Sequence, residues 1–149
     1  MIIGVPKEIK LQEHRIGLTP ESVKALTEKN HEVLVENNGG FEAGFINEDY
    51  LKAGAKIINS PEEIFKKAEL IVKVKEPQMN EVKMIRENQI IYTYLHLAAA
   101  KQLTEGLVKS KSVCIVLVGL YSPILNDDLI TGVDPCIVFF TNEGLPLSS

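Results

Sequence analysis

Short runs of β-branched residues alternate with segments that carry helix-start signals, and this alternation restricts the fold more than any other feature of the sequence. The pattern is typical of a parallel sheet whose strands are joined by crossover helices. It predicts an α/β fold built on an open, doubly wound and mostly parallel sheet. The predicted strands are residues 2–6, 32–36, 55–58, 70–75, 89–95 and 112–120.

Two of the predicted helices share one start signal, in which a hydroxyl residue is followed by proline and glutamate. Thr19 and Ser60 are the hydroxyl residues, and each can accept a hydrogen bond from an unpaired amide of the first turn. Proline suits the first helical position, and an acid is favourable near a helix N-terminus. These signals predict two helices, and weaker patterns predict three more: 20–29, 61–67, 47–53, 80–87 and 98–110.

Length, charge and hydropathy restrict the class of protein. A chain of 149 residues with 45% hydrophobic content is long enough for one domain with a substantial core. The net charge is −4, and the 16 basic residues form no stripe, which argues against a nucleic-acid partner. No apolar run approaches the roughly 18 residues that span a bilayer, so we predict a cytoplasmic protein with no membrane partner.

Neither the cysteines nor the glycines form a recognisable cofactor or metal site. Cys114 and Cys136 each begin a CIV triplet rather than a CxxC or Cys/His cluster, which predicts buried free thiols and no metal. The segment GGFEAG (39–44) follows a strand but does not fit G-x-G-x-x-G, and no GK[ST] occurs. The sequence therefore predicts a Rossmann-like domain without a dinucleotide fingerprint and without cofactor-binding residues.

Three side chains suited to binding an anion or moving a proton follow the carboxyl ends of predicted strands. Arg15 lies in the loop after the first strand, Lys75 ends the fourth, and His96 follows the fifth. Ligands of open parallel sheets bind outside the carboxyl ends of the strands. The topology therefore predicts that these three side chains lie on one rim of the sheet.

Each of these residues also has a purely structural interpretation. An isolated histidine is often a packed ring, and a loop arginine is often free at the surface. Lys75 shares a strand face with Lys73, so both could be solvated ends of an edge strand. The run LIVKVK is, however, too apolar for an edge strand of a small sheet. Strand alternation also places Tyr92, Tyr94 and His96 on one polar-tipped face that could line a pocket.

Several blocks of the sequence resemble the N-terminal substrate domain of bacterial L-alanine dehydrogenases. The blocks span nearly all of residues 1–114, and they are IIGVPKEIK, HRIGLTPESV, NHEVLVENNGG, INEDYLKAGAKI, LIVKVKEPQ and YTYLHLAA. KVKEP and TYLHLAA are the most specific of them. The α subunit of proton-translocating transhydrogenases, a related family, shares the GVPKE block but generally lacks the histidine block.

The resemblance implies reversible, NAD-dependent oxidative deamination of L-alanine to pyruvate and ammonia, carried out by a closed homo-oligomer. Arg15 and Lys75 would bind the substrate carboxylate, Lys75 would also polarise the carbonyl or imine, and His96 would be the general acid/base. These residue types suit the roles, because a guanidinium pairs with a carboxylate through two hydrogen bonds and imidazole titrates near neutral pH.

The resemblance stops short of the C-terminus. Residues 114–135 look inserted and 136–149 resemble the family's next strand, so we predict a substrate domain over 1–113 and a divergent tail. The family's NAD-binding domain is absent from the sequence, so we expect this chain not to bind NAD tightly and to be inactive alone. A natural truncation, a disrupted reading frame and an engineered fragment all fit such a sequence.

Two other functions stay open from the sequence. The divergent tail would suit a remnant that acts as an oligomerisation or interaction module with no ligand. The other alternative is the N-terminal domain of a transhydrogenase α subunit. The YLHLAA block disfavours that alternative, which would also require a dinucleotide motif that the chain lacks.

Overall fold

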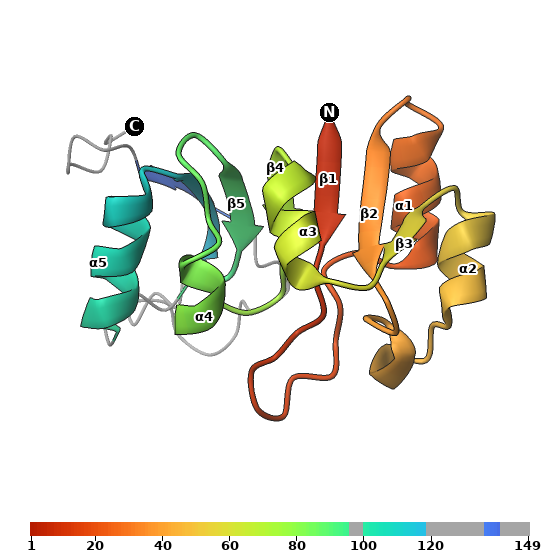
Figure 1. Cartoon of the computed structure of the whole chain (residues 1–149), viewed down its shortest axis with the longest axis horizontal. Helices are drawn as coiled ribbons and strands as arrows, with labels where there is room; N and C mark the ends of the chain where they lie inside the picture. Colours follow the sequence, from red (N-terminus) through yellow and green to blue (C-terminus); the bar gives the residue numbers. More distant parts are fainter. Residues whose placement is uncertain (96–99, 119–135, 141–149) are drawn as a thin grey trace, which may run out of the picture.

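One seven-stranded sheet forms the centre of the chain, in the order β3-β2-β1-β4-β5-β6-β7 (Figure 1). The computed structural model describes residues 1–95, 100–118 and 136–140, and of 116–118 and 136–140 it describes the backbone alone. The strands are β1 (Ile2–Val5), β2 (Glu32–Glu36), β3 (Lys56–Ile58), β4 (Leu70–Val72), β5 (Ile90–Thr93), β6 (Val113–Val118) and β7 (Cys136–Phe140).

The first six strands pair in parallel, and β7 pairs antiparallel with β6. Their order, 3-2-1-4-5-6, is that of a doubly wound sheet, in which the chain starts in the middle and winds outward to both sides. The predicted open, mostly parallel α/β sheet is therefore confirmed. β4, which contains the first half of LIVKVK, lies between β1 and β5 and is an interior strand.

The helices begin where the local sequence signals predict. Thr19 Oγ1 accepts a hydrogen bond from the amide of Ser22 at 3.3 Å, and Ser60 Oγ accepts one from the amide of Glu63 at 3.4 Å. Both N-caps are confirmed. The helices are α1 (Pro20–Thr27), α2 (Asn47–Lys52), α3 (Pro61–Lys67), α4 (Met79–Val82) and α5 (Lys101–Ser110), with a 3-10 turn at Phe41–Ala43.

The helices cover the two faces of the sheet separately, which gives the fold its two hydrophobic cores. α1 and α2 pack on one face through Val23 and Tyr50, against strand residues such as Val33. α3, α4 and α5 pack on the other, with Ile64 and Phe65 of α3 fully buried (Figure 1). This arrangement places every crossover over a face of the sheet and leaves the carboxyl ends of the strands free for loops.

Among the elements that the structure describes in full, three are shorter than the sequence predicts by at least three residues. β4 ends at Val72 rather than at residue 75, because the amide of Val74 donates to the carboxylate of Glu8 and not to a neighbouring strand. β5 covers 90–93 rather than 89–95. α4 ends at Val82 rather than at residue 87, because the chain continues in i+3 turns, with the Met84 amide donating to the carbonyl of Glu81 at 2.8 Å.

The cysteine prediction is confirmed where the side chain is described. Cys114 is a buried free thiol, and burial raises its pKa. The side chain of Cys136 lies outside the described residues. Of the helices in the described part of the chain, none has the length and hydropathy to cross a membrane.

We predict that Gly4→Ala destabilises the fold by about 1–3 kcal/mol. A Cβ on Gly4 would lie 2.6 Å from Ile64 Cγ2 and 2.8 Å from Ala68 Cβ, so α3 would have to move away from β1. Urea unfolding measures the change, with Val108→Ala as a control, because that side chain is 62% exposed. A Gly4 variant as stable as the control would contradict the close packing of α3 on β1.

Candidate functional site

The winding of the sheet reverses direction between β1 and β4. β1 pairs with β2 on one side and with β4 on the other, so the loops that follow β1 and β4 leave the same rim in opposite directions. In open α/β sheets the crevice at such a switch point is where ligands bind. Arg15 belongs to the loop after β1, residues 6–19, and Lys75 to the loop after β4, residues 73–78.

Backbone contact brings these two loops together. A Cβ on Gly17 would lie 2.5 Å from the carbonyl oxygen of Val72 and 3.2 Å from the amide nitrogen of Lys73, so only glycine allows this approach. The loop after β1 therefore passes directly over the end of β4. Arg15, two residues before this contact, is held at the switch point.

The guanidinium of Arg15 holds a carboxylate of its own loop. Its Nε donates to Glu13 Oε1 at 2.8 Å and its Nη2 donates to Glu13 Oε2 at 2.7 Å, while the Arg15 amide donates to Oε1 at 2.9 Å. The Glu13 side chain is only 6% exposed, whereas that of Arg15 is 64% exposed. Among the described residues, Nη1 has no hydrogen-bond partner, so one edge of the guanidinium is paired and the other faces outward.

The charges at this position favour an ionised carboxylate. The pKa of Glu13 is lowered to about 2, chiefly by the hydrogen bonds from the Arg15 side chain and in smaller part by the charge of Lys75, against the opposing effect of desolvation. Glu13 in turn raises the pKa of Arg15, and Tyr94 adds to that effect. Arg15 pairs with the Glu13 carboxylate, the charge of Lys75 acts on the same carboxylate, and Tyr94 acts on Arg15; we call these four residues the rim site.

The two lysines of KVK have different environments. Lys75 is half-buried at the rim, and its carbonyl accepts a hydrogen bond from Thr93 Oγ1 at 2.8 Å. Lys73 is buried, with its side chain 1% exposed and paired with two carboxylates. The interpretation of both lysines as solvated ends of an edge strand is therefore wrong, since β4 is interior and Lys73 is enclosed.

Two of the three predicted site residues lie on the loops at the switch point. Arg15 pairs with Glu13, and the charge of Lys75 acts on the same carboxylate. His96 lies outside the described residues. Of the residues predicted to form a polar-tipped face, Tyr92 is half-buried and packs against the core on the side of α1 and α2, and Tyr94 is 42% exposed and raises the pKa of Arg15. The face itself stays a prediction.

The sequence interpretation missed Glu13. A local signal was available, because an acid two residues before an arginine in a loop can reach back to its guanidinium. The structural interpretation of Arg15 was a free surface arginine, and Glu13 was given no role. Across the described ranges, no three His, Cys, Asp or Glu side chains are grouped so that they could hold a metal ion.

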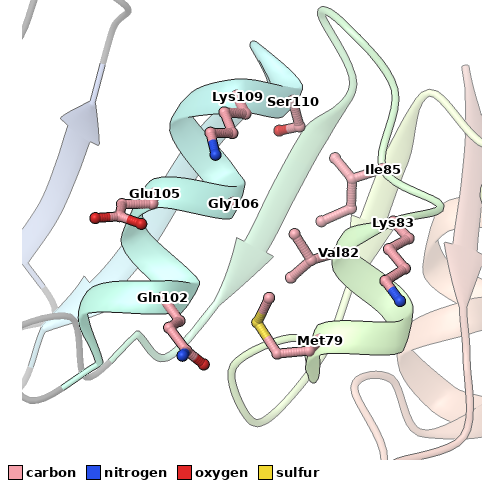
Figure 2. A pocket seen from close by; sticks show the side chains of 9 residues that line it. All are labelled: Met79, Val82, Lys83, Ile85, Gln102, Glu105, Gly106, Lys109 and Ser110. Atoms are coloured by element: carbon pink, nitrogen blue, oxygen red, sulfur yellow. The ribbon is translucent and has the colours of Figure 1, made fainter.

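Two described cavities lie elsewhere. An open groove of about 440 Å³ runs between α4 and α5, where Val82 and Gly106 bring the two helices together (Figure 2). A second cavity of about 350 Å³ adjoins it, between the 76–79 segment and the start of α5. Neither cavity is lined by Arg15, Lys75 or Glu13. The α4–α5 groove has an apolar floor and a rim of mixed charge, and its geometry indicates no particular chemistry.

Comparison with known proteins gives a consistent result. The family described as "Alanine dehydrogenase/PNT, N-terminal domain" matches residues 4–118. The alanine dehydrogenase of Methanococcus maripaludis is 45% identical over 111 residues, which are 74% of this chain and 30% of that protein. The alanine dehydrogenase of Bacillus subtilis is 47% identical over 116 residues, which are 78% of this chain and 30% of that protein.

Solved structures agree with the sequence relatives. An L-alanine dehydrogenase structure is 45% identical with a TM-score of 0.78, covering 83% of this chain and 34% of its own. A transhydrogenase from Sinorhizobium meliloti has a TM-score of 0.72 at 23% identity over 78% of this chain and 33% of its own, which shows the shared fold alone. The chain therefore spans about a third of the length of the relatives that it matches.

We predict that Glu13 stays ionised in the folded chain until the pH approaches about 2. Because its folded pKa lies below the usual 4.5, Glu13 stabilises the fold above pH 4.5, and this contribution is lost as the pH falls from 4.5 towards 2. NMR titration of the Glu13 side chain measures the pKa. Arg15→Met should raise it towards 4.5, and titration of Glu13 near 4.5 in the unmodified chain would contradict the pairing.

Proposed function

The chain belongs to the alanine dehydrogenase/PNT N-terminal domain family, and from this premise we propose that its rim site binds the carboxylate of pyruvate or L-alanine. Catalysis by the family would then be the reversible, NAD-dependent deamination of L-alanine to pyruvate and ammonia. This chain would supply the substrate-binding part of that reaction. Its relatives are alanine dehydrogenases at 45–47% identity, whereas the likeness to a transhydrogenase extends only to the fold.

The observation that supports this proposal most is the position of Glu13. Its carboxylate is bound by Arg15 through two hydrogen bonds of 2.7 and 2.8 Å and lies in the field of Lys75. The lowered pKa of Glu13 therefore indicates that the rim site stabilises a negatively charged carboxylate. A site that lowers the pKa of a carboxylate to about 2 stabilises the charge that pyruvate carries at neutral pH.

Each residue would have a separate role in binding and chemistry. The outward Nη1 edge of Arg15 would bind the substrate carboxylate, while Glu13 fixes the orientation of the guanidinium. Lys75 would add a second cation to that carboxylate and polarise the carbonyl or imine at the reacting carbon. His96 would exchange a proton there, since imidazole is both acid and base near neutral pH.

The described residues after β1 are not suited to NAD. A dinucleotide-binding fold has a glycine-rich turn at this position, which leads at once into a helix whose amides face the pyrophosphate. Here the loop carries the carboxylates of Glu8 and Glu13, and Gly17 packs against the backbone of Val72. We therefore assign none of these residues to NAD binding. We propose that the relatives bind NAD with the part of their length that this chain does not match.

Two further proposals concern organisation. We propose that the substrate domain covers 1–113, that 114–135 is an insertion, and that the sequence pattern of the family resumes in 136–149, which contains β7. We also propose that the chain self-associates as a homo-oligomer, in keeping with the family expectation. The alternative of an interaction module without a ligand predicts that the rim site has no affinity for small carboxylates, so the binding experiment below separates the two.

We predict that pyruvate shifts the NMR signals of Arg15 and Lys75 in a saturable manner. Arg15→Met and Lys75→Met should each weaken binding at least tenfold, because a hydrogen bond to a charged group contributes about 1.5–3 kcal/mol and about 1.4 kcal/mol is a factor of ten. Lys56→Met is a matched control, because Lys56 is exposed and lies on β3, an edge strand that is two strands away from β1.

Methyl pyruvate, which lacks the carboxylate, is the ligand control. It should produce no saturable shift at the rim site. Equal binding of pyruvate and its methyl ester, or no loss of pyruvate binding in either rim variant, would contradict carboxylate recognition by Arg15 and Lys75.

We predict no NADH oxidation by the purified chain with excess pyruvate and ammonium. Hydride transfer requires the nicotinamide at about 3–3.5 Å from the substrate carbon, and the described residues offer no means of holding it there. Absorbance at high chain concentration measures the rate. Turnover that disappears in His96→Ala would show that this chain builds a cofactor site of its own and would contradict the prediction.

A further inference from the structure

Three buried charged side chains lie beneath the rim site. Lys73, Glu8 and Glu81 are the charged residues that are buried in the described part of the chain, with their side chains 1%, 2% and 3% exposed. Lys73 Nζ lies 2.8 Å from Glu81 Oε1 and 3.2 Å from Glu8 Oε2. We call these three residues the buried triad.

The buried triad is a poor source of stability. Removing three charges from water is unfavourable, and a buried ion group contributes less than well-packed apolar residues of the same volume often would. The triad also carries one carboxylate more than it has cations, and desolvation raises the pKa of Glu8 despite the charge of Lys73. The backbone segments that these three residues hold in place explain the arrangement better than a contribution to stability does.

The second oxygen of each carboxylate binds the backbone of the loop after β4. Glu8 Oε1 accepts from the amide of Val74 at 2.7 Å, and Glu81 Oε2 accepts from the amide of Gln78 at 2.7 Å. Both are charge-assisted hydrogen bonds, which are shorter and stronger than neutral ones. The triad therefore fixes the 73–78 loop at three residues, which are Lys73 itself, Val74 and Gln78.

These bonds fix the backbone on both sides of Lys75. The peptide before it is held by Glu8, through the Val74 amide, and its own carbonyl accepts from the hydroxyl of Thr93, which is fully buried. The Tyr94 amide also donates to the Val74 carbonyl at 3.3 Å. The half-buried Lys75 side chain therefore starts from a backbone that has little freedom to move.

Glu8 connects this backbone to Arg15. It lies in the 6–19 loop, so its carboxylate ties the loop that carries Arg15 to the loop that carries Lys75. An ion pair between Lys10 and Glu76 joins the same two loops at a second position. The distance between the two cations of the rim site thus depends on contacts beneath them.

We propose that the buried triad is a positioning device, in which Glu8 and Glu81, joined through Lys73, set the spacing of Arg15 and Lys75 for one carboxylate. Lys73, Glu8 and Glu81 are positioning residues that need not touch the substrate. The inference rests on the proposed function for its ligand, and it adds a role for three residues outside the rim site. It also explains why KVK contains two lysines in different environments, one structural beneath the rim and one at it.

The test compares two substitutions of Glu8. Glu8→Gln keeps the shape and an oxygen that can accept from the Val74 amide, whereas Glu8→Leu keeps approximate volume and removes both acceptors. We expect pyruvate binding within about threefold of the unmodified chain for Glu8→Gln and weakened at least tenfold for Glu8→Leu. Glu63→Leu is the matched control, because its exposed pair with Lys67 lies on α3, and it should leave binding unchanged.

Amide hydrogen exchange at Tyr94 is the second measurement, because this amide donates to Val74 and reports whether the 73–78 loop stays in place. Its exchange should accelerate at least tenfold in Glu8→Leu and not in the control. If Glu8→Leu alone does not fold, the triple variant Glu8→Leu, Lys73→Met, Glu81→Leu replaces it, since removing all three charges together leaves no unpaired ion. The same losses are expected in that variant.

The outcomes separate this inference from the function on which it rests. If the unmodified chain binds pyruvate and the folded leucine variant binds it equally well, the positioning role is wrong and the rim site stands. If the unmodified chain binds no pyruvate, the ligand is wrong, and Tyr94 exchange alone decides the positioning role. Unchanged exchange in the leucine variant would overturn it, and accelerated exchange would support it.

Discussion

The parallel pairing of β1 with β4 is the constraint on which the rest of the structure depends. It places Ile3 opposite Leu70 and Gly4 opposite Ile71, and it forces the chain to cross from one half of the sheet to the other through α3. The absence of a side chain at Gly4 lets α3 lie close to the sheet at that crossing. The loops that carry Arg15 and Lys75 both leave the sheet from this pair, so the pairing places these two residues on one rim.

The site that results combines two cations with carboxylates close by in the fold. Arg15 and Lys75 belong to the loops at the switch point, Glu13 pairs with Arg15, and Glu8 accepts a hydrogen bond from the backbone beside Lys75. Two positive side chains at close range repel each other unless the charge around them is balanced. The acids of the loops provide that balance, and the ligand that we propose for the rim site is an anion although the chain as a whole is acidic.

Much of the fold could be predicted from the sequence because it is determined locally. β-branched runs gave the strands, and the hydroxyl-proline-glutamate signals at Thr19 and Ser60 gave two helix starts to the residue. The end of β4 could not be predicted, because the group that takes the Val74 amide is Glu8, 66 positions away in the chain. The strand propensity of a short segment carries no information about a partner so distant in the sequence.

Part of the candidate site could likewise be predicted from the sequence, and part of it could not. Topology alone placed Arg15 and Lys75 on one rim, since their positions after β1 and β4 follow from the strand order. The contrast between Lys73 and Lys75 was out of reach, because alternation treats them alike and only the carboxylates of Glu8 and Glu81 distinguish them. The pairing of Glu13 with Arg15 could have been predicted from their spacing in the sequence, but it was overlooked.

The most direct test of carboxylate binding at the rim site is a crystal structure of the chain grown in saturating pyruvate. We expect a pyruvate carboxylate between the outward edge of the Arg15 guanidinium and Lys75 Nζ, at the carboxyl ends of β1 and β4, with the Glu13 pair retained behind it. Pyruvate bound only elsewhere, such as in the groove between α4 and α5, or a rim site without ligand at saturation, would contradict it.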